Sequence, residues 1–183
     1  TQIKNKAVYE FDCMVSMLQK NGVEVIVVDH DNGTETPDAV FPNNWFSTHQ
    51  NGDVYLYPMN AMNRRLERKL EIFDIIKEKY HLRISNIIDF TLGEKEDLFL
   101  EGTGSMILDR VNGFIYASIS KRTSEKLLSE YAKKINYDVI SFKSYHSSSS
   151  LSPLIYHTNV MMCLASSFAV ICLESILDKN ERQ

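Results

Sequence analysis

Three short polar segments of the 183-residue chain contain side chains that could take part in chemistry. The first places Asn43 and Asn44 between a proline and the only tryptophan, and the second sets Glu101 before two nearby glycines. The third brings His157 to the start of an apolar strand. Amides donate and accept hydrogen bonds, and an imidazole exchanges protons near neutral pH. Taken singly, these segments are more typical of an ordinary turn, a loop and a structural histidine.

The spacing of these residues suggests that they belong together. Asn44, Glu101 and His157 are separated by 57 and 56 residues, so they fall at equivalent points of successive units. In a ring of repeated units, equivalent points converge on the axis. A carboxylate and an imidazole that meet there form a Glu–His pair, in which the glutamate orients the ring and stabilises its protonated form. Such a pair normally serves a nucleophile.

The elements that would position these side chains recur along the chain. The predicted order within a unit is strand, hairpin turn, strand, helix and strand, with Asn-Gly at each hairpin turn. Complete units are predicted at about 39–88 and 104–142, and the first of them is expected to begin with a strand over 39–47. The helix and strand that end an earlier unit are predicted within 5–28, the helix over 5–20 and the strand over 23–28. The start of a later unit is predicted over 160–183. One unit alone leaves a sheet face uncovered, so the units must stack or close into a ring.

Predicted helix caps indicate the length of a unit. Asn63, Thr123 and Ser175 are the predicted N-caps, and they lie 60 and 52 residues apart. The chain also begins at Thr1 rather than at a methionine and stops where a helix is expected to begin. We therefore expect a repeat protein that is cut within a unit at both ends.

Composition excludes several classes of protein. The chain is 44% hydrophobic and 24% charged, as is usual for a soluble globular protein. A net charge of −4 argues against a nucleic-acid or anionic-membrane partner, and no apolar run is long enough to span a membrane. Three distant cysteines indicate a reducing compartment, so a cytoplasmic location is expected. The histidines and cysteines lack metal-ligand spacing, so no metal is expected.

Five stretches of the chain, taken together, resemble the guanidine-modifying superfamily of amidinotransferases and arginine deiminases, and most closely its citrulline-linked hydrolases. They are PDAVFPNNWFSTH (37–49), YPMNAMNRRLER (57–68), LEGTGSMILDR (100–110), ASISKRTSE (117–125) and IYHTNVMM (155–162). The resemblance implies an α/β fold, a five-bladed propeller of ββαβ units, of which this chain would supply about three. It also implies a hydrolase that needs no cofactor and takes a small amino-acid substrate. The resemblance is compatible with a homo-oligomer.

The same resemblance suggests roles for individual residues. Glu101 and His157 match the family's catalytic acid and histidine. Arg122 matches an arginine that holds the α-carboxylate of the substrate, a task that suits a bidentate guanidinium. Asp38 matches a position near the amino-acid end of the substrate. Arg64-Arg65 is a weaker candidate for contact with an acidic substrate, because its position at a helix start is equally consistent with surface contacts.

Two asparagines depart from the arginine-processing pattern. Arginine deiminases carry carboxylates where Asn44 and Asn159 stand, and those carboxylates pair with a cationic guanidinium. A ureido group is neutral and has an oxygen in place of one nitrogen, so an amide can donate to that oxygen and accept from the NH groups. An amide also avoids burying an unpaired anion. We therefore expect a ureido substrate such as citrulline, with an arginine-type guanidino compound as the alternative.

The nucleophile is a third departure. The family uses a cysteine well beyond the HTN segment, and Cys13, Cys163 and Cys172 do not occupy that place. All three are expected to be buried structural thiols with a raised pKa. The chain alone is therefore expected to be inactive. A catalytically inactive fragment, or a scaffold that binds an amino acid, is the alternative to the hydrolase.

Overall fold

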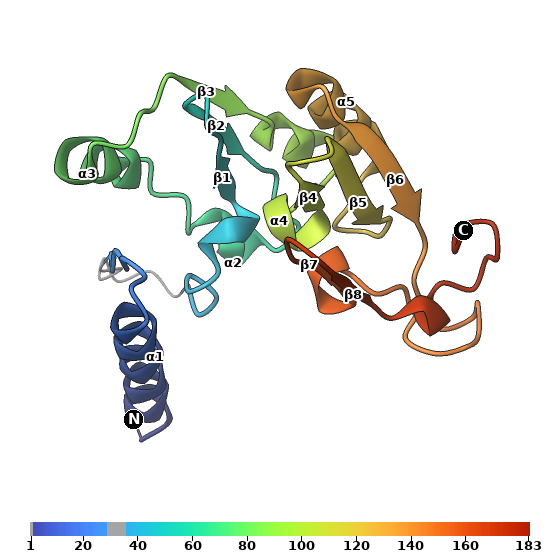
Figure 1. Cartoon of the computed structure of the whole chain (residues 1–183), viewed down its shortest axis with the longest axis horizontal. Coiled ribbons are helices and arrows are strands. Elements are labelled where there is room, and N and C mark those ends of the chain that lie inside the picture. The colour runs from blue at the N-terminus through green and yellow to red at the C-terminus, as the bar shows by residue number, and fades with distance from the viewer. Residues whose placement is uncertain (1, 29–35) are drawn as a thin grey trace. The chain divides into compact units, whose positions relative to one another are not determined.

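The protein is described by a computed structural model that covers residues 2–28 and 36–183 (Figure 1). The chain divides into two compact units, residues 1–33 and 34–183. The first unit holds helix α1 (Gln2–Lys20), which contains the helix predicted at 5–20. Gly22 follows the helix with a φ of +79°, a backbone conformation that favours glycine.

The strand predicted at 23–28 is not formed. These residues have no regular secondary structure, and no strand pairs with them among the described residues of either unit. An apolar run needs hydrogen-bonding partners before it becomes a strand, so its composition alone does not decide its conformation.

The second unit contains two three-stranded sheets with the same topology (Figure 1). In each sheet the first two strands are antiparallel, and the third lies parallel to the second. The sheets consist of β1 (Phe46–Thr48), β2 (Asp53–Leu56) and β3 (Asn86–Asp89), and of β4 (Ile107–Asp109), β5 (Phe114–Ser118) and β6 (Asp138–Phe142). A third, antiparallel pair is formed by β7 (Met162–Leu164) and β8 (Ala169–Ile171).

Helices connect the second and third strands of each sheet. The connection in the first sheet contains α2 (Met62–Arg65) and α3 (Glu71–Tyr80), and the one in the second sheet contains α5 (Glu125–Ile135). Parallel neighbours require such a crossover, because a tight turn cannot join them. The predicted order of strand, hairpin, strand, helix and strand is therefore formed twice, and the fold is mixed α/β.

The Asn-Gly hairpin turns are confirmed at both predicted positions. Gly52 and Gly113 join the antiparallel strands with φ values of +87° and +73°. A Cβ atom at Gly52 would also lie 2.5 Å from the hydroxyl oxygen of Ser85. Glycine is therefore required at position 52 by both the backbone conformation and the space available.

All three predicted helix caps are wrong. The helix predicted from Asn63 is broken into α2 and α3, and the N-cap of α2 is Ala61. Thr123 pairs through its backbone with Leu100, which keeps it extended, so α5 begins one residue later with Ser124 as its N-cap. Ser175 starts no helix, because its hydroxyl donates to the preceding Cys172 carbonyl and it ends the short helix η4 (Leu173–Ser175).

Four further short helical segments did not emerge from the sequence. They are η1 (Pro42–Asn44), η2 (Thr91–Glu96), α4 (Gly102–Ser105) and η3 (Thr158–Val160). Residues 39–45 had been predicted as the first part of a strand, but η1 replaces it and β1 begins only at Phe46. Figure 1 shows α4 close to both β1 and β7, so this short helix joins successive sheets.

The main core of the second unit lies between α5 and its sheet. Tyr131 of α5 is fully buried, with its ring centroid 5.0 Å from that of Tyr55 and 5.7 Å from that of Tyr57. Ile115 and Ala117 of β5 complete this cluster from the sheet. Because Tyr55 and Tyr57 come from the neighbouring sheet, the cluster fixes the two sheets against each other.

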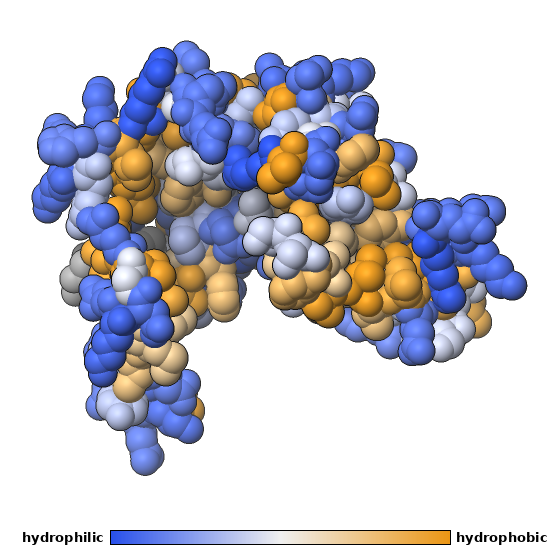
Figure 2. Space-filling view, in the orientation of Figure 1, coloured by the Kyte–Doolittle hydropathy of each residue, from blue (hydrophilic) through white to orange (hydrophobic). Residues whose placement is uncertain are grey.

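The cysteines are exposed, contrary to the prediction of buried thiols. Alternation along the β7–β8 hairpin explains the exposure of Cys163. Met162 and Ile171 face the core, whereas Cys163 and its partner Val170 face the other way. Figure 2 shows hydrophobic side chains at the surface over β8. Within the described ranges, no helix combines the length and apolarity needed to cross a membrane.

Candidate active site

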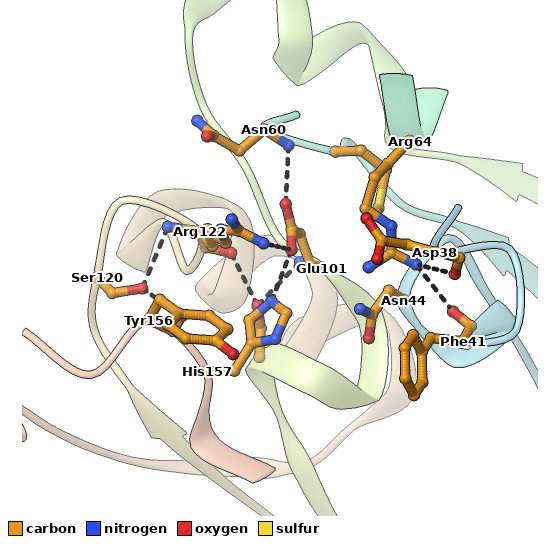
Figure 3. A network of polar contacts seen from close by, with 12 residues as sticks. Asp38, Phe41, Asn44, Asn60, Arg64, Glu101, Ser120, Arg122, Tyr156 and His157 are labelled. Carbon is orange, nitrogen blue, oxygen red and sulfur yellow. Dashed lines mark hydrogen bonds and ion pairs between the residues drawn. The ribbon is translucent and has the colours of Figure 1, made fainter. Parts of the chain in front are cut away.

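Glu101 and His157 meet in the second unit, although 56 residues separate them in sequence (Figure 3). Glu101 is fully buried at the start of α4, and His157 lies directly before η3. Nε2 of His157 donates a hydrogen bond to Oε2 of Glu101 over 2.6 Å. The other carboxylate oxygen, Oε1, accepts from the backbone N–H of Asn60 at 2.9 Å. Glu101 therefore orients the imidazole and is itself held in place.

The surroundings of Glu101 keep it ionised. Burial raises the pKa of this carboxyl, but the hydrogen bonds from His157 and Asn60 and the nearby Arg122 charge lower it more. The net result is a pKa below the ordinary value. The carboxylate therefore presents its negative charge to the Nε2–H group of His157.

Two glycines allow the segments of the site to approach one another. Gly102 has a φ of +47°, and a Cβ atom there would lie 2.2 Å from the carbonyl oxygen of Asn43. A Cβ atom at Gly104 would lie 2.5 Å from Oδ1 of Asn44 and 3.0 Å from the His157 ring. Only glycine permits this packing of α4 against both η1 and the histidine. The two glycines beside Glu101 were the sequence signal for this close approach.

Arg122 approaches the same carboxylate oxygen of Glu101 as His157 does. Its NH1 nitrogen is 3.4 Å from Oε2 of Glu101, and its guanidinium carbon lies 5.0 Å from the centre of the Tyr156 ring. A cation over an aromatic face is stabilised by the ring quadrupole. The side chain is about one-third exposed and has no other hydrogen-bond partner among the described residues, so donors remain for an incoming carboxylate.

A cavity of about 480 Å³ opens beside the histidine. Six of the seven predicted site residues line it, namely Asp38, Asn43, Asn44, Arg122, His157 and Asn159. Glu101, the seventh, lies buried behind His157. Arg64, from the weaker Arg64-Arg65 candidate, lines the cavity as well. Sequence reasoning missed four further lining residues, Phe41, Ala61, Tyr156 and Val160. For Tyr156 the only signal was its place beside the histidine.

The two neighbouring arginines of the candidate pair hold the chain. Arg64 is buried, forms a bidentate ion pair with Glu67 at 3.0 Å, and donates to the carbonyl oxygens of Asp38 and Phe41 (Figure 3). It therefore fixes the turn that brings Asp38 to the cavity. Arg65 donates to the carbonyl oxygen of Met59 at 2.8 Å.

No cysteine lines this cavity, whose lining comes entirely from the described part of the chain. Within residues 2–28 and 36–183, no cluster of histidine, cysteine and carboxylate side chains is arranged to hold a metal ion. The residues that meet here therefore offer an imidazole–carboxylate pair, an arginine with free donors, an acid and several amides.

The family described as N,N dimethylarginine dimethylhydrolase, eukaryotic, matches residues 1–183 of the chain. The chain belongs to this family. The dimethylarginine dimethylhydrolase family is a guanidine-modifying one, so the superfamily assigned from the five sequence stretches is confirmed. No curated protein matches the chain.

Solved structures share the fold of this family member at low identity. The apo structure of ArgZ, an arginine dihydrolase from cyanobacteria, is 19% identical with a TM-score of 0.72, over 98% of this chain and 26% of ArgZ. The N-terminal domain of ArgZ bound to substrate is 20% identical with a TM-score of 0.71, over 97% of this chain and 58% of that domain. A dimethylarginine dimethylaminohydrolase in an adduct is 14% identical with a TM-score of 0.62, over 91% of this chain and 60% of that enzyme. The chain thus spans about a quarter of ArgZ and less than two-thirds of the other two.

Proposed function

We propose that this chain carries part of the active site of a hydrolase that acts on the ureido or guanidino carbon of a free amino acid, with citrulline as the substrate. The observation that carries the proposal is the 2.6 Å hydrogen bond between His157 and the buried Glu101 at a cavity that Arg122 also lines. An acid–base pair beside a carboxylate-binding cation matches the two ends of such a substrate.

The proposed reaction uses a cysteine that this chain does not supply. A thiolate attacks the ureido carbon, and the leaving amine takes a proton from His157. Water, losing a proton to His157, then attacks the carbonyl carbon of the carbamoyl–cysteine intermediate, and carbamic acid and the thiolate are released. Glu101 stabilises the imidazolium in both steps. Neither a cofactor nor a metal takes part in this sequence.

The cavity residues would bind the two ends of the amino acid. Arg122 offers free donors to the α-carboxylate, and Asp38 offers a carboxylate to the α-amino group. Asn44 lies against Gly104 beside the histidine, where its amide, like those of Asn43 and Asn159, would face the ureido group. An amide suits both the oxygen and the NH groups of a neutral ureido.

An arginine-type guanidino compound is the alternative substrate. The family description favours it, since dimethylarginine carries a guanidino group. The carboxylate of Asp38 at the cavity could pair with such a cation. The neutral amides at positions 44 and 159 favour citrulline instead, because a buried guanidinium needs a counter-charge.

We also propose that the sheets are blades of a five-bladed propeller, of which this chain supplies about three. The two sheets of equal topology and the β7–β8 hairpin support units at about 39–88, 104–142 and 160–183. Helix α1 supports the end of an earlier unit within 5–28. Three free cysteines are consistent with a reducing, cytoplasmic location.

Turnover by a protein that joins this chain to a segment with the family's cysteine, called the full-length protein below, tests the function. We expect the full-length protein to release ornithine from citrulline, and His157→Ala to abolish this release. Chain 1–183 should be inactive, because none of its cysteines reaches the cavity. If the wild-type full-length protein converts neither citrulline, arginine nor dimethylarginine, the hydrolase is refuted, and the scaffold that binds an amino acid is favoured.

A further inference from the structure

Four fully buried hydroxyl side chains near the proposed site form hydrogen bonds and have no role in the chemistry above. They belong to Ser105, Ser118, Ser144 and Thr158. A buried hydroxyl is costly unless it forms hydrogen bonds. The hydroxyls of Ser118 and Ser144 satisfy each other at 2.7 Å. The other two bond to the segments that carry the site residues.

Ser105 contacts the segments of all three polar residues that surround the reacting centre. Its hydroxyl accepts a hydrogen bond from the backbone N–H of Glu101 at 2.9 Å and donates one to the carbonyl oxygen of Arg122 at 2.7 Å. Its carbonyl oxygen accepts a hydrogen bond from the hydroxyl of Thr158, the residue after His157.

Thr158 extends this connection to the sheet. Its hydroxyl oxygen also accepts a hydrogen bond from the backbone N–H of Ser118 in β5 at 2.8 Å. The single hydroxyl of Thr158 therefore holds η3 against both α4 and β5. Because His157 directly precedes Thr158, the position of its imidazole relative to Glu101 depends on these contacts.

We propose that Ser105 is a positioning residue of the active site, which sets Glu101, Arg122 and the His157 segment at their working separations. This inference rests on the proposed function. Without the Ser105 hydroxyl, the N–H of Glu101 keeps only a 3.3 Å contact with the carbonyl oxygen of Arg122. A displacement of about 1 Å among reacting groups can lower a rate by about 100-fold.

The test compares Ser105→Ala with Ser118→Ala in the full-length protein, once its wild type has shown turnover. Each substitution deletes one fully buried hydroxyl, but the Ser118 hydroxyl contacts only that of Ser144. We expect Ser105→Ala to lower kcat by about 10- to 100-fold and to raise KM. Ser118→Ala should lose thermal stability while its kcat and KM stay at the wild-type values.

A second measurement does not depend on turnover. In chain 1–183, the Nε2 proton of His157, held in the 2.6 Å hydrogen bond to Glu101, should resonate downfield of the backbone amides in proton NMR. Ser105→Ala should shift or broaden this resonance. Ser118→Ala should leave it in place.

The outcomes separate the inference from the proposed function. Unchanged kinetics and an unchanged resonance in folded Ser105→Ala overturn the positioning role. Equal kinetic losses in Ser105→Ala and Ser118→Ala also overturn it, because they would reflect stability alone. If Ser105→Ala does not fold, Ser105→Cys fills the same site with a slightly larger and weaker hydrogen-bonding group and is judged by the same criteria. A wild type without turnover refutes the hydrolase, while the resonance still decides the role of Ser105.

Discussion

Asn44 and Asn159 bring neutral amides to the cavity that Arg122 and His157 also line. Asn44 is buried beside Gly104, whereas Asn159 is exposed within η3. A charge at position 44 would have to be paired, because an isolated buried anion is strongly destabilised. Replacing these two amides by carboxylates therefore tests whether the site distinguishes a neutral substrate from a cationic one.

For the proposed citrulline hydrolase, we expect Asn44→Asp combined with Asn159→Asp to shift the substrate preference toward arginine. A carboxylate pairs with a guanidinium but faces the ureido oxygen lone pair to lone pair. Hydrogen bonds to charged groups contribute roughly 1.5–3 kcal/mol, or about 10- to 100-fold in the ratio of the two kcat/KM values. Asn63→Asp, exposed and outside the cavity, is the control. A ratio that the double variant leaves unchanged contradicts this role.

The lowered pKa of Glu101 predicts a dependence of stability on pH. Because the folded-state pKa lies below that of the unfolded chain, about 4.3, the carboxylate stabilises the fold fully above that pH. This contribution is lost as the pH falls through the folded-state pKa. We therefore expect Glu101→Gln to flatten the fall in unfolding free energy between about pH 5 and pH 3, measured by denaturant unfolding. Glu78→Gln, an exposed carboxylate of α3, should keep the wild-type slope.

At the scale of elements, the start of α5 distinguishes two neighbouring hydroxyls. The Ser124 hydroxyl accepts from the backbone N–H of Leu127, whereas the buried Thr123 hydroxyl has no hydrogen-bond partner among the described residues. Ser124→Ala should therefore cost about 0.5–2 kcal/mol of unfolding free energy. Thr123→Val should be neutral or stabilising, because it removes an unpaired polar atom. Chemical denaturation of both variants measures this, and a larger loss for Thr123→Val would contradict the assigned cap.

Local sequence signals predicted those elements whose geometry is decided locally. The Asn-Gly turns at Gly52 and Gly113 need positive φ, which glycine supplies without help from the rest of the fold. The repeated unit was also predictable, since each helix and strand has its own apolar period. The meeting of Glu101 and His157 followed from the equal spacing of the units.

Elements that depend on tertiary contacts were not predictable in the same way. The short helix α4 exists because Gly102 and Gly104 allow it to pack against Asn43, Asn44 and His157. Helix α2 ends early where three arginines donate to other segments. Arg64 and Arg65 donate to the carbonyl oxygens of Phe41 and Met59, and Arg68 donates to the carboxylate of Glu94. The exposure of the cysteines depends on which face of a short hairpin meets the core. The residues next to each of these elements in sequence do not determine such contacts.

At the scale of the whole molecule, several large apolar side chains of the second unit remain exposed. Phe168 and Val170, around β8, are 61% and 58% exposed, and Ile140 of the third strand of its sheet is also exposed. Exposed apolar surface at strand edges favours association. We expect the mass of chain 1–183 to rise with concentration in size-exclusion chromatography with light scattering.

Substitution at this surface gives the control for self-association. Phe168→Ser with Val170→Ser should restore a constant monomer mass. Val111→Ser, at an isolated exposed position beside a hairpin turn, should not change the association. A monomer at every concentration of the wild-type chain would contradict the prediction.

The cavity is built from segments that lie far apart in sequence, around residues 38–44, 61–64, 122 and 156–160. A small molecule bound there would contact several of them at once and would favour only the folded chain. Ligand binding and folding are therefore thermodynamically linked, with a stabilisation of RT ln(1 + [L]/Kd). For this reason the melting temperature reports occupancy of the cavity even where no covalent bond is formed, and substrates can be ranked without any turnover.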